Sequence, residues 1–390
     1  MFLTNSLVAA EYDKDWRVFV QTIDKEYPFF ELKSIRTDWN KTKRELAKRV
    51  DACKSDSEFM GIVSDALDCL RDAHMGIQET KVSLPNPPDK FCLPVAFMPA
   101  QDNGVMVMAA SPQGATAVLH PGMLIRSING KPARTVLEAQ SDALWKAGGP
   151  FSSPQRARIL AYRMPLMSDK IDPYKIVYVS DGKEVQLVLK NDSPSRGWVK
   201  TYNMPKNLER GEGSSFYSLL PSGVGYIYLR RIQGEQTTAG IQAALKKFPD
   251  AYGWIVDLRG NGGGGYGQDL QTVFKGNRKP VAVIIDAGCI SAGETYARDL
   301  RNMANARLFG STTAGSSSSK RDWRFPSGIA TVRFSTRSRQ ENGKPIEFNG
   351  ISPDEVIEPV SKEVLAGQNS EILRAEQYLL KKSGRSPAKK

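Results

Sequence analysis

The sequence predicts a multidomain α/β protein with a helical N-terminal domain, a β-rich domain and a domain built on a βαβ layer. Three observations support this class: helical periodicity in the first 84 residues, a proline cluster followed by short β-like runs, and strand-like runs that alternate with helical stretches after residue 223. At 390 residues the chain has room for two to three domains. The expected boundaries are 1–84, 85–195, 196–362 and 363–390, the last being a C-terminal helix and basic tail.

Residues 1–84 are predicted to form a small helical domain. Apolar side chains recur at i, i+3, i+4 and i+7 from Trp16 to Ile23, and again from Phe59 to Ala66. This spacing places them on one face of an amphipathic helix, which is the face that a helical domain buries.

Residues 85–195 are predicted to form a β-rich domain, because three prolines between positions 85 and 88 end the helical pattern. The β-like runs 174–179 and 185–189 flank Asp181-Gly182, a pair that favours a hairpin turn. A helical stretch over 137–164 interrupts the β pattern.

From residue 223 the strand-like runs 224–229, 254–257 and 281–285 alternate with helical stretches. This alternation predicts a mainly parallel sheet that is buried on both faces. Ligand sites in such layers form at the carboxyl ends of the strands. The residues that follow 254–257 and 281–285 are therefore the candidates for chemistry.

Two distinctive segments follow these strands. Asp257-Leu-Arg-Gly-Asn-Gly-Gly-Gly-Gly265 ends in four successive glycines, which let backbone amides approach a ligand, but it lacks the Gly-Lys-Ser/Thr of a P-loop. Cys289-Ile-Ser-Ala-Gly-Glu294 opens a helix, and its Ser291 and Glu294 have the spacing of a capping box. Two interpretations stay open at this point: a helix cap, or a serine nucleophile beside an oxyanion-binding loop.

Composition and charge argue against several other classes. Four cysteines without a CxxC spacing and two histidines do not support a zinc site, and no metal or organic cofactor is expected. The chain has no run of 18 apolar residues, so no membrane span is expected.

The net charge of +12 includes a basic stretch from Arg298 to Arg339 and five basic residues in the last ten. Without a nucleic-acid-binding motif, we interpret this excess as a solvated basic face and expect no specific nucleic-acid partner.

Three segments together resemble the signature blocks of the S41 family of serine peptidases, which contains the C-terminal processing proteases and the tricorn core peptidase. They are Asp257-Leu-Arg-Gly-Asn-Gly-Gly-Gly, Ser291-Ala-Gly-Glu294 and Gly350-Ile-Ser-Pro-Asp354, in the order and rough spacing of the family. Upstream, residues 117–132 resemble half of a PDZ domain. The resemblance implies a ClpP/crotonase-like βαβ peptidase core, a PDZ-like middle domain, and a peptide or unfolded protein as the substrate.

Carried over to this sequence, the resemblance places the nucleophile on Ser291 and the oxyanion donors on the N–H groups of Ala292 and Gly263. The tricorn-like branch of the family uses a histidine base and a glutamate, and these positions correspond to His74 and Glu347. An imidazole accepts a proton near neutral pH, which suits a general base.

At two positions the chain departs from the family. The processing branch activates its serine with a lysine in a Thr-x-Gly-Lys segment, whereas this chain has Thr313-Ala-Gly-Ser316, with Lys320 four positions further on. Ala73 stands where the tricorn-like branch often has a small hydroxyl residue before its histidine. Lys320 is therefore the alternative base to His74.

The resemblance also implies a periplasmic or secreted location, since most members of the family act outside the cytoplasm. The first ten residues end like a small-residue cleavage site but lack a basic n-region. A function from another class fits the same residues: a catalytically silent protein that binds extended peptides or an apolar ligand through the PDZ-like segment and a sheet edge. Under that hypothesis Ser291 is only a helix cap.

Overall fold

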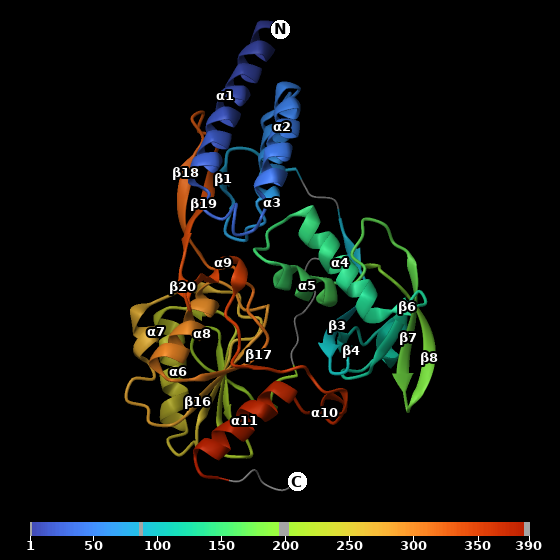
Figure 1. Ribbon diagram of the computed structural model, residues 1–390, viewed down its shortest axis with the longest axis vertical. Coiled ribbons are helices and arrows are strands. Elements are labelled where there is room, and N and C mark those ends of the chain that lie inside the picture. The colour runs from blue at the N-terminus through green and yellow to red at the C-terminus, as the bar shows by residue number, and fades with distance from the viewer. Residues whose placement is uncertain (1, 86–88, 195–202, 386–390) are drawn as a thin grey trace. The chain divides into compact units, whose positions relative to one another are not determined.

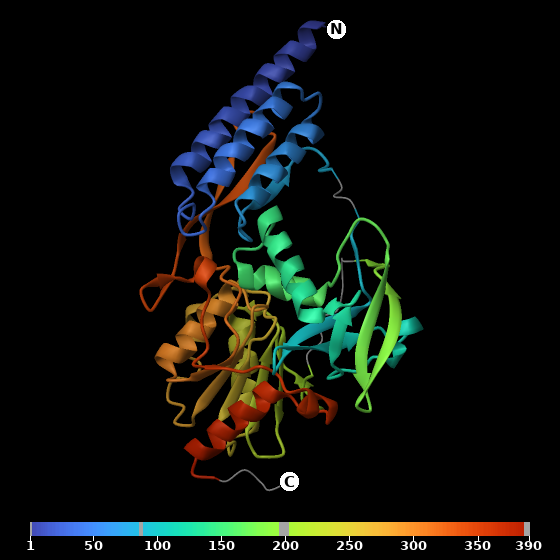
Figure 2. The same cartoon turned by 45° about the vertical axis from the view of Figure 1, so that its right-hand side comes forward.

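The computed structural model describes residues 2–85, 89–194 and 203–385, with side chains from residue 11 onward (Figures 1 and 2). The chain divides into two compact units, the first made of 1–88, 143–154 and 316–349, and the second of 89–142, 155–315 and 350–390. The predicted boundary at 195 and the last five residues of the basic tail lie outside the described residues. The predicted division into four parts stays a prediction.

Three helices and a small antiparallel sheet build the first unit (Figure 2). The helices confirm the predicted periodicity, and their apolar faces cover the sheet β1-β19-β18. Strands β18 and β19 of this sheet were not predicted. They come from residues 318–338, and the helical pattern of the first 84 residues gives no sign that distant strands pack against it. The bounds are α1 Phe2–Glu26, α2 Arg36–Asp51, α3 Asp56–Cys69, β1 Gly76–Thr80, β18 Ser318–Arg324 and β19 Ala330–Ser338.

Aromatic side chains join the helices of the first unit to one another and to the segment after β18. Phe19 of α1 stacks on Phe325, the residue that follows β18, with ring centroids 5.5 Å apart, and Tyr12 of α1 stacks on Phe59 of α3 at 5.0 Å. Burying each such ring contributes roughly 1.5–3 kcal/mol to the stability of the fold. This packing brings the segment that ends in Glu347 into the same unit as the N-terminal helices.

A seven-stranded sheet forms the centre of the second unit, in the order β10-β11-β12-β14-β16-β17-β22. The strands from β12 to β22 are parallel, and β10 and β11 continue the sheet in antiparallel register. The runs predicted at 224–229, 254–257 and 281–285 are β12, β14 and β16, which confirms the parallel layer. The bounds are β10 Glu209–Arg210, β11 Ser215–Leu219, β12 Gly225–Leu229, β14 Trp254–Asp257, β16 Val281–Ile285, β17 Arg307–Gly310 and β22 Glu355–Val356.

Helices connect and cover these strands (Figure 1). Ile255 and Ala282 pack with Ile372 of the C-terminal helix α11. The loops 258–264 and 286–291 leave the carboxyl ends of the neighbouring strands β14 and β16, so they emerge at the same edge of the sheet. The helices are α6 Glu235–Lys247, α7 Gln268–Thr272, α8 Ala292–Met303 and α11 Ser370–Lys382.

The β-rich part of the second unit contains a four-stranded antiparallel sheet, β6-β5-β7-β8, and the hairpin β3-β4. The predicted hairpin is present: Asp181 and Gly182 link β7 to β8 with φ of 49° and 74°, the positive values that a type I′ turn requires. The likeness to a PDZ domain stays a prediction. The bounds are β3 Val95–Ala100, β4 Gly104–Ala110, β5 Ile125–Ile128, β6 Lys131–Pro132, β7 Pro173–Ser180, β8 Lys183–Lys190, α4 Ala133–Ala147 and α5 Pro154–Arg163.

The other elements are short. Among the described residues, no helix is both long enough and apolar enough to cross a bilayer. The short elements are β2 Phe91–Cys92 with β9 Ser193–Pro194, β13 Ile232–Gln233 with β15 Gly264–Gly265, β20 Gln340–Glu341 with β21 Lys344–Pro345, the 3₁₀ helix Gly114–Val118, α9 Ile346–Asn349 and α10 Ser361–Leu365.

Candidate active site

Ser291 lies at the start of helix α8, in the second unit. Its N–H donates to Glu294 Oε2 at 3.0 Å, and its side chain completes a capping box with Glu294. The capping interpretation is therefore correct for the backbone. A cap does not explain the conformation of Ser291, however, because N-cap residues ordinarily adopt β-region angles, whereas Ser291 has φ of 56° and ψ of −117°. Strained backbone of this kind concentrates at functional sites.

The glycine loop after β14 lies directly against this serine. A Cβ atom on Gly263 would stand 2.9 Å from Cβ of Ser291, and Gly263 has a φ of 71°. The N–H of Gly263 donates to Asn261 Oδ1 at 2.9 Å, so this predicted oxyanion donor is engaged by its own loop. Ala292 is the first residue of α8, where backbone N–H groups lack intrahelical acceptors and the helix dipole favours negative charge.

Asp286, which the sequence analysis missed, fixes the two loops. Its Oδ1 accepts the N–H of Gly260 at 2.8 Å and that of Gly288 at 2.9 Å, and its Oδ2 pairs with Arg163 at 2.9 Å. One carboxylate thus holds the glycine loop to the loop that leads into Ser291. An Asp directly after a predicted strand was the available signal.

Glu294 has two further partners besides Ser291. Its Oε1 accepts the hydroxyl of Thr313 at 2.6 Å and the N–H of Gly315 at 2.7 Å, and its side chain is buried. The Thr313-Ala-Gly segment, which the sequence analysis compared with the lysine-bearing segment of the processing branch, is thereby tied to the start of α8.

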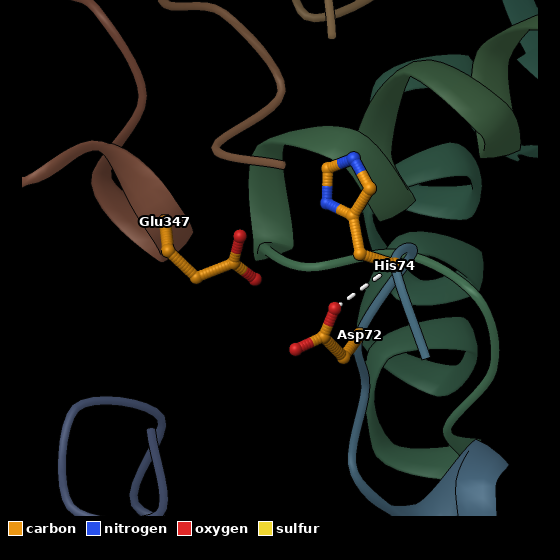
Figure 3. A group of neighbouring side chains, drawn as sticks. All are labelled: Asp72, His74 and Glu347. Atoms are coloured by element: carbon orange, nitrogen blue, oxygen red, sulfur yellow. Dashed lines mark hydrogen bonds between the residues drawn. The ribbon is translucent and has the colours of Figure 1, made fainter. Parts of the chain in front are cut away.

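His74 lies in the first unit, between α3 and β1, and its backbone N–H donates to Asp72 Oδ1 at 2.9 Å (Figure 3). Burial, reinforced by the positive charges of Lys320 and Lys33 and opposed by Asp72, lowers the pKa of His74 to about 4. His74 is therefore a neutral imidazole at physiological pH, the form that can accept a proton.

Glu347 belongs to the same unit, and Figure 3 shows its carboxylate directed toward Asp72 and His74. The side-chain ligand atoms of the three residues lie within 4.8 Å of one another. Glu347 Oε2 accepts the backbone N–H of Ser317 at 2.9 Å. Burial and the neighbouring Asp72 raise the pKa of Glu347 to about 8, although Lys33 opposes the shift.

Lys33 was missed by the sequence analysis, because a single lysine in a helical region gives no signal. Its side chain is fully buried. Its ammonium donates to Glu347 Oε1 at 2.8 Å, to the hydroxyl of Tyr27 at 3.0 Å and to the carbonyl of Arg71 at 2.7 Å, and it lies 3.5 Å from Asp72. Although burial disfavours the charge of Asp72, Lys33 and a hydrogen bond from His74 hold the pKa of Asp72 below its ordinary value.

Ser152 supplies a hydroxyl group next to Ala73, where the tricorn-like branch of the family often has a hydroxyl residue of its own. The Ser152 hydroxyl accepts the Ala73 N–H at 3.2 Å and also hydrogen-bonds with Glu347. Ser152 is fully buried, and its segment belongs to the first unit. A hydroxyl from a distant part of the chain therefore joins the turn that carries His74 to Glu347.

The three side chains Asp72, His74 and Glu347 are of types that bind metal ions. The ammonium of Lys33 already lies between the two carboxylates, 2.8 Å from one and 3.5 Å from the other. The donor set is thus neutralised by a side chain, and we do not assign a metal to it.

The predicted site residues fall into two groups. Ser291, Ala292 and Gly263 are brought together in the second unit, and His74 and Glu347 in the first.

Residues 223–275 and 266–357 match the family model of peptidase family S41. Over these residues the chain is similar to family S41. This similarity identifies it as a serine-type peptidase, a hydrolase that acts on peptides or proteins. A comparison with curated proteins found no match.

Solved structures that resemble this chain share its fold. CPAF complexed with lactacystin matches with a TM-score of 0.61 at 12% identity, over 97% of this chain and 98% of that one. A mutant of CPAF matches with a TM-score of 0.64 at 12% identity, over 98% and 99%. The tricorn protease matches with a TM-score of 0.46 at 15% identity, over 97% of this chain and 37% of that one. The two CPAF structures support the multidomain α/β fold of this chain.

Proposed function

We propose that the protein hydrolyses peptide bonds through an acyl-enzyme on Ser291, with His74 as the general base and Glu347 as the acidic partner of His74. The observation that carries this proposal is the backbone of Ser291, a residue strained at φ 56° on the first turn of a helix and packed against a glycine loop. A serine that served only as a cap would not need this conformation.

In this mechanism His74 takes the proton of Ser291 as the hydroxyl oxygen attacks the carbonyl carbon of the scissile bond. The carbonyl oxygen becomes an oxyanion, which the N–H groups of Ala292 and Gly263 stabilise, the latter by leaving or sharing its bond to Asn261. The protonated imidazole then gives its proton to the leaving amine as the C–N bond breaks. Water activated by His74 hydrolyses the acyl-enzyme and restores Ser291.

The carboxylates of the first unit support His74 in this scheme. Imidazolium is disfavoured at a buried site whose neighbours include Lys320 and Lys33. The negative charge on Asp72 and the Glu347 carboxyl group offset this when the proton arrives.

Substitution of the two central residues tests the proposal. We expect Ser291→Ala and His74→Ala each to lower kcat by roughly 10⁴- to 10⁶-fold, because members of a triad act as a unit. The control is Ser215→Ala, another buried serine of the second unit, which should retain activity. Full activity in His74→Ala together with its loss in Lys320→Ala would transfer the base role to Lys320.

A fluorophosphonate probe tests the nucleophile without a known substrate. We expect it to label Ser291 in the folded protein and to leave Ser291→Ala unlabelled. A folded sample without any label on Ser291 would instead favour the silent peptide-binding protein.

The remaining assignments belong to the same proposal. We propose peptides or unfolded proteins as substrates, a PDZ-like role for residues 117–132 in holding them, and a periplasmic or secreted location. Similarity to family S41 supports the substrate class, and the resemblance of the middle segment supports the PDZ-like role. A cleavage profile on a peptide library, recorded for the wild type and for variants substituted in 117–132, tests both the substrate class and the PDZ-like role.

A further inference from the structure

The buried ammonium of Lys33 contacts both halves of the base site. Its partner Arg71 C=O lies at 2.7 Å, in the turn that leads to His74, and its partner Glu347 Oε1 lies at 2.8 Å, 314 residues away along the chain. A third bond goes to the Tyr27 hydroxyl at 3.0 Å. An ammonium group has three N–H donors, and all three are used.

Burying the Lys33 ammonium costs free energy of folding, so its presence needs a structural or functional reason. Lys33 and Asp72 have fully buried side chains, and the transfer of such ions out of water costs several kcal/mol each before any pairing. An apolar residue would pack at the base of the helices without that cost. The lysine instead ties the turn before His74 to Glu347 through its bonds to Arg71 C=O and Glu347 Oε1.

We infer that Lys33 is a positioning residue of the base site: its ammonium joins the turn that carries His74 to the carboxylate of Glu347 and fixes how the two face each other. This inference rests on the proposed function for its catalytic consequence. In chemical terms Lys33 is a buried cation that pairs with Asp72 and hydrogen-bonds with Glu347. Four charged groups influence His74: Lys320, Asp72, Lys33 and Arg333.

The first test is Lys33→Met, which keeps an unbranched side chain one atom shorter and removes its charge. We expect kcat to fall roughly 10- to 100-fold, as for other partners that orient a catalytic ligand, with KM changed by less than about threefold. The acid limb of the pH–rate profile should move up by about one pH unit or more, because loss of a nearby positive charge makes protonation easier for both His74 and the carboxylates. The matched control is Lys43→Met, which removes a lysine paired with Asp24 at 2.7 Å in the same unit.

Because Lys33→Met leaves two buried acids without a counter-ion, a second comparison uses Glu347→Gln as its background. If Lys33 acts through Glu347, adding Lys33→Met to Glu347→Gln lowers kcat by less than about threefold. Additive losses of kcat in the two substitutions would overturn the inference, as would an unchanged kcat and pH profile in folded Lys33→Met.

A spectroscopic readout separates this inference from the proposed mechanism. In the Ser291→Ala background, carbon-13 NMR of labelled glutamate should show the Glu347 carboxyl titrating at higher pH once Lys33→Met is added, with Glu347→Gln identifying the signal. An unmoved titration overturns the role of Lys33 whatever residue acts as the nucleophile. Activity retained by His74→Ala would overturn the proposed mechanism while leaving this titration intact.

Discussion

The nucleophile side and the base side of this peptidase are built in different ways. The nucleophile side uses backbone groups from two short segments, the glycine loop after β14 and the start of α8, which leave neighbouring strands of one sheet. The base side uses buried side chains, and its central contact, Lys33 to Glu347, joins residues 314 positions apart. Close backbone contacts shape the nucleophile side, and interactions between buried polar side chains shape the base side. Different substitutions should therefore abolish the function of each side.

Gly263→Ala should have the largest effect among backbone substitutions on the nucleophile side. The added Cβ would stand 2.9 Å from Cβ of Ser291 and 3.0 Å from the carbonyl oxygen of Ile290, in a residue with φ of 71°. We expect kcat to fall roughly 10²- to 10³-fold, the loss typical when an oxyanion donor is displaced. The strained φ should lower stability by about 1–2 kcal/mol.

The matched control for this substitution is Gly265→Ala, two positions further along the same loop, where an added Cβ meets no atom within 4 Å. The Gly265→Ala variant should retain kcat within about threefold, since its added Cβ does not clash with any neighbouring atom. Equal losses in the two variants, measured by steady-state kinetics, would mean that loop flexibility and not the close approach to Ser291 matters.

The contrast between the two sides also explains what the sequence could predict. The parallel layer, its strands β12, β14 and β16 and the two loops were predicted correctly, because periodicity, glycines and strand ends are local signals. Ser291 stood out for the same reason. The strain at Ser291 was not predictable, because a capping box and a nucleophile have the same residue types at this spacing.

On the base side the sequence offered much less. His74 and Glu347 were assigned only through a family resemblance, and Lys33 and Ser152 were missed. A buried lysine and a buried serine have no pattern of their own, since they become significant only when packing brings distant segments together. Strands β18 and β19 were missed for the same reason, as their partners are the N-terminal helices and β1.

Ser152→Ala tests a smaller contribution on the base side. Its hydroxyl accepts the Ala73 N–H at 3.2 Å and hydrogen-bonds with Glu347, so its removal leaves a buried N–H without that partner. We expect kcat to fall about 3- to 10-fold and stability to drop by about 1–2 kcal/mol. Ser152→Thr, which keeps the hydroxyl, should recover most of kcat if the hydroxyl itself matters. Equal losses in the Ala and Thr variants would instead point to packing.

The pH dependence of stability should report on the base side, where Glu347 and His74 have strongly shifted pKa values. Glu347 has a pKa of about 8 in the folded protein against an ordinary 4.5, so its contribution is complete below pH 4.5 and is lost as the pH rises through 8. His74 has a pKa of about 4 against an ordinary 6.5, so its contribution is complete above pH 6.5 and is lost as the pH falls through 4.

Between pH 4.5 and 6.5 these two trends oppose each other, and above pH 6.5 only the loss from Glu347 remains. We therefore expect the free energy of unfolding to change little from pH 5 to 6.5 and then to fall by up to about 2 kcal/mol by pH 8, at no more than 1.4 kcal/mol per pH unit for one proton. Denaturant unfolding of the wild type and Glu347→Gln measures this, because the Gln variant should lack the fall above pH 6.5. A fall of equal size in both proteins would show that the buried carboxyl group of Glu347 is not its source.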